Sequence, residues 1–234
     1  MRILGIDSSG LVASVAVVDE EQMLAEYTVN YKKTHSQTLL PMLNEIGKMI
    51  ELDLQTIDAI AVAAGPGSFT GLRIGSATAK GLGLALDKPL VAVPTVEGLA
   101  YNLCGTEKVV CPLMDARRNQ VYTGIYEFEG NDLKVLEGQM AISIDELVEK
   151  INQWNREVIF LGDGVPVFQK VLEEKVTVPF AFAPAHMNKQ RAGAVAALGL
   201  RYAKEGRMQS AAEHQPDYLR LSQAERERAE RENG

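Results

Sequence analysis

Short apolar runs open the chain and are separated by polar turns. Each run has the length of a strand, and the turns between the runs are rich in Ser and Gly or in Asp and Glu. This pattern is typical of strands that follow one another through tight connections. It predicts an antiparallel meander of three strands at 3–7, 11–18 and 23–29.

The spacing of the apolar residues then changes to a helical period over residues 36–51. Proline at position 41 is near enough to the start of this segment to be tolerated in a helix. The predicted helix has an apolar stripe, which requires a partner surface. The stripe consists of Leu39, Leu40, Leu43, Ile46 and Ile50.

Strands and helices alternate over the following residues, which predicts a parallel portion of sheet. Residues 57–63 form a continuous apolar run that ends near a Gly-Pro-Gly turn, as expected of a strand buried on both faces. We predict a helix over 70–86, a strand over 90–93 and a short helix over 95–103. The first lobe, residues 1–103, would end here.

A second set of elements predicts a second lobe over residues 104–221, so the fold class is α/β with two lobes of mixed sheets and flanking helices. Ser143 and Glu146 have the spacing of a capping box, which predicts the start of a helix. The Ala-rich helix over 191–204 is expected to pack back on the body. Residues 222–234, dense in Glu and Arg, form a charged tail. The remaining predicted elements are strands at 109–114, 121–128, 133–140 and 158–161 and helices at 143–152 and 167–173.

The composition is that of a globular protein, with 46% hydrophobic and 24% charged residues among 234. No apolar run approaches the ~20 residues that span a bilayer, and the N-terminus has no signal-peptide pattern. We therefore expect a cytoplasmic protein with no membrane partner. The formal net charge of -7 gives no general attraction to phosphate, so another subunit is expected to hold any RNA. Cys104 and Cys111 belong to no ligand cluster and are expected to be reduced thiols.

The Gly-rich segment of residues 65–75, GPGSFTGLRIG, joins a predicted buried strand to a predicted helix. Backbone N–H groups at such a place can bind phosphate, but the Lys-Ser/Thr ending of a nucleotide-binding loop is missing. A structural turn is the preferred interpretation. Beyond the turn, small residues recur every fourth position, and each glycine costs about 1 kcal/mol of helix propensity. This spacing allows close approach either to the chain's own core or to a partner subunit, and we favour the partner. The small residues are Gly71, Gly75, Ala79 and Gly83.

Other candidate chemistry is sparse. Asp7, followed by Ser8 and Ser9, stands where an actin-like ATPase has its metal-associated acid and first phosphate loop, but these are also ordinary turn residues. Arg117 and Arg118 could bind an anion or form a charged hairpin turn. The three histidines, His35, His186 and His214, are scattered and suit no metal or nucleophile site. We predict no catalytic residue and no metal ligand.

Three segments together resemble the TsaB (YeaZ) family: GPGSFTGLRIG at 65–75, DARRNQVY at 115–122 and PDYLR at 216–220. The resemblance implies a two-lobed, actin-like ATPase (ASKHA, ribonuclease H-like) fold that has lost its chemistry. Thr95 and Leu99 stand where the catalytic relative TsaD has two metal-binding histidines, and arginines replace the glycines of a second phosphate loop. ATP, threonylcarbamoyl-adenylate and metal are expected on partner subunits, and Asp7, Ser8 and Ser9 are a vestigial phosphate loop.

The resemblance also implies a partner surface made by the helices that begin near Ser36 and Thr70. This surface would pair with TsaD, or with a second copy when the protein is alone, and support the ATPase TsaE; tRNA would be touched only indirectly. The predicted interface residues are His35, Ser36, Leu39, Leu40, Leu43, Phe69, Thr70, Gly71, Arg73, Ile74, Gly75, Thr78, Ala79, Leu82 and Gly83.

The implied function is that of a non-catalytic scaffold and activator in N6-threonylcarbamoylation of adenosine 37 in tRNAs that read codons beginning with A. The alternative is an enzyme, either a small-molecule kinase that uses Asp7 or a glycoprotease-like hydrolase. The sequence leaves open the oligomeric state of the free protein, residual nucleotide binding, direct tRNA contact by Arg117 and Arg118, and the role of the tail.

Overall fold

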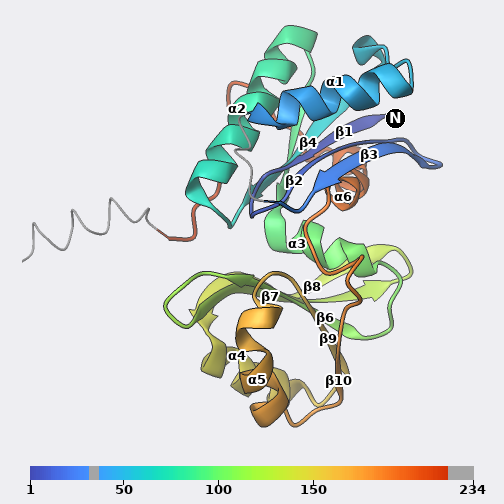
Figure 1. Cartoon of the computed structure of the whole chain (residues 1–234). Helices are drawn as coiled ribbons and strands as arrows, with labels where there is room; N and C mark the ends of the chain where they lie inside the picture. Colours follow the sequence, from blue (N-terminus) through green and yellow to red (C-terminus); the bar gives the residue numbers. More distant parts are fainter. Residues whose placement is uncertain (32–36, 221–234) are drawn as a thin grey trace, which may run out of the picture.

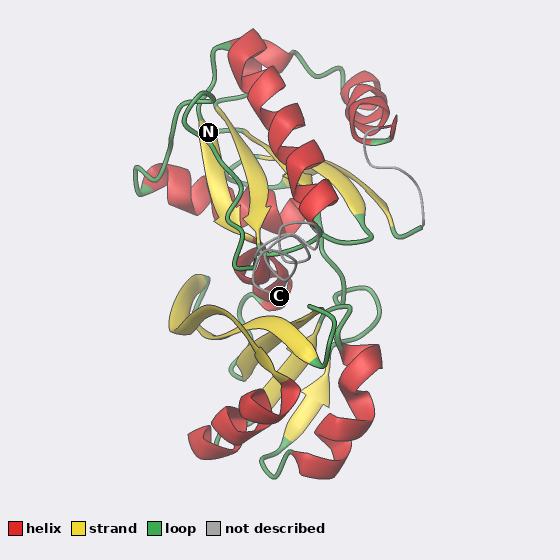
Figure 2. Cartoon of the chain, turned by 90° about the vertical axis from the view of Figure 1, so that its left-hand side faces the viewer, coloured by secondary structure: helices red, strands yellow, loops and turns green. Residues whose placement is uncertain are grey.

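The computed structural model, which describes residues 1–31 and 37–220, contains two separate five-stranded sheets. Each sheet is flanked by helices and forms one lobe (Figures 1 and 2). The predicted α/β class with two lobes of mixed sheets is therefore confirmed. No helix within these described residues is long and apolar enough to cross a membrane.

The first sheet has the strand order β3-β2-β1-β4-β5. Its strands are β1 (Ile3–Asp7), β2 (Ala13–Val18), β3 (Met23–Val29), β4 (Ala59–Gly65) and β5 (Leu90–Pro94). β1 pairs antiparallel with β2 and parallel with β4. Helices α1 (Leu39–Met49) and α2 (Phe69–Leu86) cover one face, and α6 (Ala192–Lys204) covers the other. Because both faces are covered, β1, β2 and β4 are buried along their whole length, which accounts for their continuous apolar runs.

The second sheet has the order β10-β9-β6-β7-β8. Its strands are β6 (Val109–Asp115), β7 (Gln120–Glu129), β8 (Asp132–Ser143), β9 (Val158–Leu161) and β10 (Phe180–Phe182). Helices α4 (Ile144–Trp154) and α5 (Val165–Lys175) pack on one face. The other face packs on α3 (Thr95–Ala100), which lies between the lobes (Figure 1).

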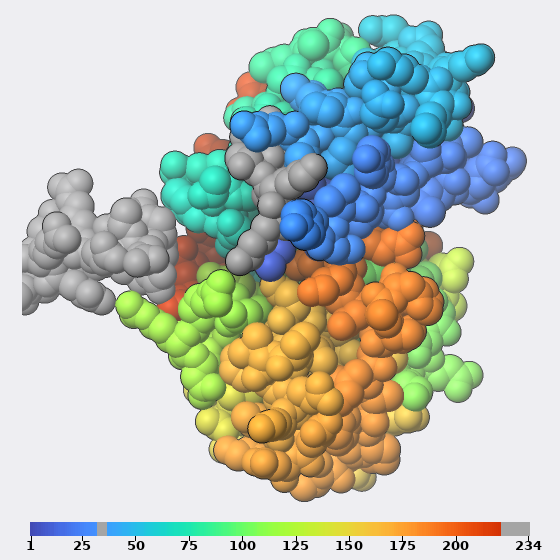
Figure 3. Space-filling model, viewed as in Figure 1, coloured from blue at the N-terminus to red at the C-terminus, as the bar shows by residue number. Residues whose placement is uncertain are grey.

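The two sheets share one topology. In each, an antiparallel meander of three strands is extended by two parallel strands on the far side of its first strand. The sequence has no recognisable internal repeat, so this duplication is visible only in the fold. The chain crosses between the lobes after the 3-10 turn Tyr101–Leu103 and again over residues 183–191, coloured orange in Figure 3.

Most predicted elements are confirmed to within about three residues of their bounds. The second strand begins later than predicted because Leu11 lies in the preceding turn with 61% of its surface exposed. The start of the first predicted helix, at 36, falls outside the described residues; α1 itself begins at Leu39. The capping box is confirmed, since Glu146 N donates to Ser143 Oγ and the Glu146 carboxylate accepts from Ser143 N. The sequence did not predict β10 or the 3-10 turn Leu54–Thr56.

Candidate functional site

The turn after β1 is closed by hydrogen bonds within the chain. Asp7, Ser8 and Ser9 are almost fully buried, with 1%, 2% and 1% of their surface exposed. Ser9 donates from both its backbone N and its Oγ to Asp7 Oδ1, at 2.9 and 2.6 Å. Ser8 Oγ donates to the Gly71 carbonyl at 2.8 Å, and the Ser9 carbonyl accepts from Ser68 N at 2.7 Å. Both serine hydroxyls therefore already donate to protein oxygens.

The start of α2 fills the space in front of this turn. Ser68 caps the helix by accepting from Gly71 N at 3.3 Å. A Cβ added at Gly67 would overlap the Ser9 carbonyl, and one added at Gly71 would overlap the Ser8 carbonyl. The glycines of the 65–75 segment thus let its backbone lie directly on the turn, in agreement with the structural interpretation.

The two serine hydroxyls of this turn are not directed toward a ligand. A phosphate loop presents free N–H and hydroxyl donors to the ligand, whereas here Ser8 and Ser9 are buried and donate to Gly71 and Asp7. The interpretation of the turn as a vestigial phosphate loop stays a prediction.

The glycine-spaced face of α2 packs on the chain itself. Ala79 is fully buried in the core between α2 and the first sheet. A Cβ added at Gly75 would lie 2.5 Å from Ser8 Oγ, and one added at Gly83 would lie 2.5 Å from Leu90 Cδ1. The prediction that Gly75, Ala79 and Gly83 are close-approach positions for a partner is therefore wrong, because this face already meets β1, β4 and β5.

The other predicted interface residues fall into three groups by the exposure of their side chains. Those with exposed side chains are Leu40, Thr70 and Arg73; those that are half-buried are Phe69, Ile74, Thr78 and Leu82; those that are buried are Leu39, Leu43 and Gly71. His35 and Ser36 lie outside the described residues.

The outward face of α2 contains residues that were not among the predicted interface residues. Ala77, Gly81 and Leu84 are exposed, and Leu84 has 68% of its surface open. A Cβ added at Gly81 would meet no atom within 4 Å, so nothing in the described chain requires a glycine there. On the neighbouring helix α1, Leu40 is 54% exposed. The sequence does contain a signal for this face, since the small residues Ala77 and Gly81 are four positions apart. The buried face of α2 has the same four-residue spacing, so the sequence alone could not show which face is exposed.

The positions compared with the histidines of TsaD are occupied by core side chains. Thr95 Oγ1 accepts from Gly65 N at 3.1 Å, and Leu99 is buried between the lobes. No group of three His, Cys, Asp or Glu side chains in the described chain could hold a metal ion. Glu97, which lies between Thr95 and Leu99 in the sequence, accepts a hydrogen bond from Tyr202, and burial raises the pKa of its carboxyl.

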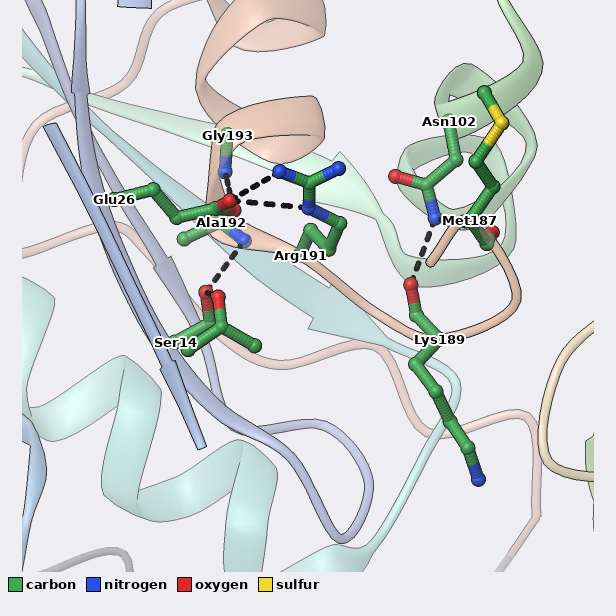
Figure 4. A network of polar contacts seen from close by, with 9 residues as sticks. Ser14, Glu26, Asn102, Met187, Lys189, Arg191, Ala192 and Gly193 are labelled. Carbon is green, nitrogen blue, oxygen red and sulfur yellow. Dashed lines mark hydrogen bonds and ion pairs between the residues drawn. The ribbon is translucent and has the colours of Figure 1, made fainter. Parts of the chain in front are cut away.

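A polar network holds the second crossing between the lobes (Figure 4). Arg191 binds the Glu26 carboxylate of β3 through two nitrogens, and Gly193 N donates to the same carboxylate at 3.0 Å. Ala192 N donates to Ser14 Oγ at 2.8 Å. The side chains of β2 and β3 thus satisfy the first N–H groups of α6, which have no partner within the helix.

Comparisons with known proteins identify the family. A family model described as TsaD, tRNA N6-adenosine threonylcarbamoyltransferase, matches residues 22–228. The tRNA threonylcarbamoyladenosine biosynthesis protein TsaB of Bacillus subtilis is 33% identical over 225 residues, which cover 96% of both chains. The chain belongs to the TsaB (YeaZ) family.

Solved structures confirm the actin-like fold. YeaZ from Pseudomonas aeruginosa, at 24% identity, has a TM-score of 0.77 over 93% of this chain and 99% of that one. The inorganic polyphosphate/ATP-glucomannokinase from an Arthrobacter strain, at 12% identity, has a TM-score of 0.52 over 87% of this chain and 99% of that one. The second likeness concerns the fold alone.

The three segments that carry the resemblance to TsaB (YeaZ) proteins meet in space. The C-terminal strap, residues 207–220, follows α6 and runs back along the first sheet, where Gln209 pairs with Leu90. Asp217 N donates to the carbonyl of Ala64, just before the 65–75 segment, at 2.7 Å. Arg220 Nη1 donates to the carbonyl of Ala116, in the 115–122 segment, at 2.8 Å. The PDYLR segment therefore connects the start of α2 with the second lobe.

Proposed function

We propose that this chain is a non-catalytic subunit of the machinery that makes N6-threonylcarbamoyladenosine at position 37 of tRNA. It pairs with the catalytic relative TsaD, supports the ATPase TsaE, and acts by stabilising one arrangement of the catalytic subunit. Family membership supports a role in this pathway, which the name of the Bacillus relative states.

The observation that carries the non-catalytic part of the proposal is the closed turn after β1. An actin-like kinase would need this turn to receive phosphate, and here its two hydroxyls are buried and bonded to the chain. This counts against the alternative of a small-molecule kinase that uses Asp7. A titration of the isolated protein with ATP and Mg²⁺ would restore that alternative if it gave stoichiometric binding.

The outward face of α1 and α2 supports the partner part of the proposal. Leu40 and Leu84 are more than half exposed, and Gly81 has open space where a Cβ would lie. A glycine in an exposed helix interior costs about 1 kcal/mol relative to alanine, and a partner helix that approaches closely would offset this cost. The same face would serve a second copy when the protein is alone.

Substitution on this face tests the surface without disturbing the core. Gly81→Arg places a long cation on the outward face of α2, where nothing in the described chain obstructs it. Gly138→Arg is a matched control, because Gly138 of β8 is also exposed with nothing within 4 Å of an added Cβ. We expect Gly81→Arg to abolish co-elution with TsaD and Gly138→Arg to retain it. Association of both variants at the wild-type level would refute the surface assignment.

The function itself is tested by reconstitution. A cognate tRNA transcript is incubated with TsaD, TsaE and the adenylate-forming enzyme of the same organism, with and without this protein. We expect threonylcarbamoylation to depend strictly on the added protein, and equal product in its absence would contradict the proposal.

A further inference from the structure

The turn between β6 and β7 has an unusual backbone. Three consecutive residues other than glycine have positive φ angles: Arg117 at 64°, Arg118 at 55° and Asn119 at 58°. L side chains rarely adopt this conformation, and such residues gather at functional positions where the surroundings enforce them. Here Arg117 N donates to Asp115 Oδ1 at 2.8 Å, and the Asn119 carbonyl accepts from Ile144 N at 3.2 Å. Glycine would adopt these φ angles at lower cost. The presence of arginines at two of these positions therefore indicates that their side chains have a role on the surface of the turn.

Little in the chain neutralises these arginines. The Arg118 side chain is exposed and makes no hydrogen bond or ion pair within residues 1–31 and 37–220. The Arg117 side chain is 86% exposed and, among the described residues, forms an ion pair with Asp115 alone, at 3.1 Å. Arg220 reaches the turn from the strap and uses one N–H on the Ala116 carbonyl. Arginine has five N–H donors, and within the described residues one of those of Arg220 is used in a hydrogen bond.

Three acidic side chains near the turn have partners within the described chain. Asp145 forms an ion pair with Lys175 at 2.7 Å, and Asp217 accepts from Gln139. Glu146 caps α4, and its hydrogen bonds to Ser143 lower the pKa of its carboxyl. Three arginines therefore gather at this turn on a chain whose net charge is -7, and Asp115, Glu146 and Asp217 nearby keep their own negative charges.

An aromatic ring lies on the same strap, two residues before Arg220. Tyr218 has 37% of its surface open, and its ring lies 4.8 Å from that of Phe69, centroid to centroid. Figure 3 shows the green turn of the second lobe beside the red end of the strap. A surface that carries both guanidinium groups and a partly exposed aromatic ring suits a nucleic acid, because phosphates bind the cations and an unpaired base can stack on a ring. An acidic protein surface would need only the cations.

We propose that an arginine patch, made by Arg117, Arg118, Arg220 and Tyr218, binds the sugar-phosphate backbone of the tRNA that the machinery modifies. This inference rests on the proposed function and departs from the expectation that tRNA contact is only indirect. The patch positions the RNA and contributes nothing to the reacting atoms. The overall negative charge of the chain repels RNA elsewhere, which would orient the contact.

Arg118 offers the cleanest test, because its side chain can be changed without loss of an internal contact. Fluorescence anisotropy would follow a labelled tRNA transcript titrated with the reconstituted complex that contains each variant. We expect Arg118→Ala to weaken binding about fivefold at low salt and to reduce the salt slope by about one, as for the loss of one phosphate contact. Arg118→Glu should weaken binding further, and Arg118→Lys should remain near wild type.

Arg156→Ala is the matched control. Arg156 is exposed but lies beside the start of β9, at the opposite end of the sheet from the turn, and pairs with Glu127. We expect its loss to leave tRNA binding unchanged, and thermal unfolding should confirm that Arg118→Ala is folded.

Two results would overturn the patch. One is tRNA binding by the Arg118→Glu complex within twofold of wild type. The other is an Arg118→Glu variant that no longer associates with TsaD but still binds tRNA, which would assign the patch to an acidic protein surface. Modification assays run alongside separate this failure from that of the proposed function. If omission of the whole protein stops modification while Arg118→Glu binds normally, only the patch is refuted.

Discussion

The contrast between two glycines of one helix gives the sharpest prediction of the packing. Gly75 and Gly81 both lie inside α2, so alanine improves the helix propensity by a similar amount, about 1 kcal/mol, at each position. Their surroundings differ. A Cβ at Gly75 would lie 2.5 Å from Ser8 Oγ and 3.8 Å from Val62 Cγ2, whereas a Cβ at Gly81 would meet nothing within 4 Å.

The net effect at Gly75 follows from three contributions. Ser8 must move away from the new methyl group, and overpacking of this kind costs about 1–3 kcal/mol. This movement breaks the buried bond from Ser8 Oγ to the Gly71 carbonyl, which is worth about 1 kcal/mol. After the helix gain is subtracted, Gly75→Ala should destabilise the protein by about 1–3 kcal/mol, whereas Gly81→Ala should stabilise it by about 1 kcal/mol.

Thermal unfolding measures both variants directly. For a chain of this length, 1 kcal/mol corresponds to about 2–4 °C, so Gly75→Ala should unfold about 2–12 °C below wild type and Gly81→Ala above it. Urea titration with an unchanged slope would confirm that the difference is one of stability. The reasoning would be refuted if Gly75→Ala were as stable as wild type, or if Gly81→Ala were the less stable variant.

Three further predictions concern single contacts. Burial raises the pKa of Glu97, so the contribution of its carboxyl to stability is fully present below the ordinary glutamate pKa and is lost as pH rises through the raised folded pKa. Thermal scans from about pH 4 to 8 should show Glu97→Gln more stable than wild type near neutrality, and the difference should close in acid. Arg191→Ala leaves the Glu26 carboxylate, 9% exposed, without its ion pair, and should cost about 2 kcal/mol in a urea titration; a change under about 0.5 kcal/mol would contradict this. Ser143→Ala removes the cap of α4 and should cost about 1 kcal/mol, and an unchanged midpoint would show that the cap contributes nothing.

Local patterns in the sequence predicted most of the fold. Strand and helix periods, together with turn residues, are set by neighbours in the chain, which is why β3 and β9 have their predicted bounds. β10 was missed because its three residues carry no period of their own. It is a strand only through its parallel pairing with β9.

The site was predicted less well because its contacts join distant residues. The glycine spacing of α2 correctly indicated a close approach, but the groups approached are within the chain: Ser8, 63 residues before Gly71, and Leu90 next to Gly83. A sequence cannot distinguish such an internal neighbour from a partner subunit. The strap is a similar case, since Asp217 and Arg220 donate hydrogen bonds to Ala64 and Ala116, which are more than a hundred residues away in the sequence.

The measurement that tests the central claim most directly is add-back of purified variants to the reconstituted tRNA modification reaction that lacks this protein. The account predicts that wild type and Gly138→Arg restore threonylcarbamoylation, while Gly81→Arg, although folded, leaves product at the level seen without the protein. Full restoration by Gly81→Arg would contradict the helix-face mechanism. Equal product with no protein added would contradict the function itself.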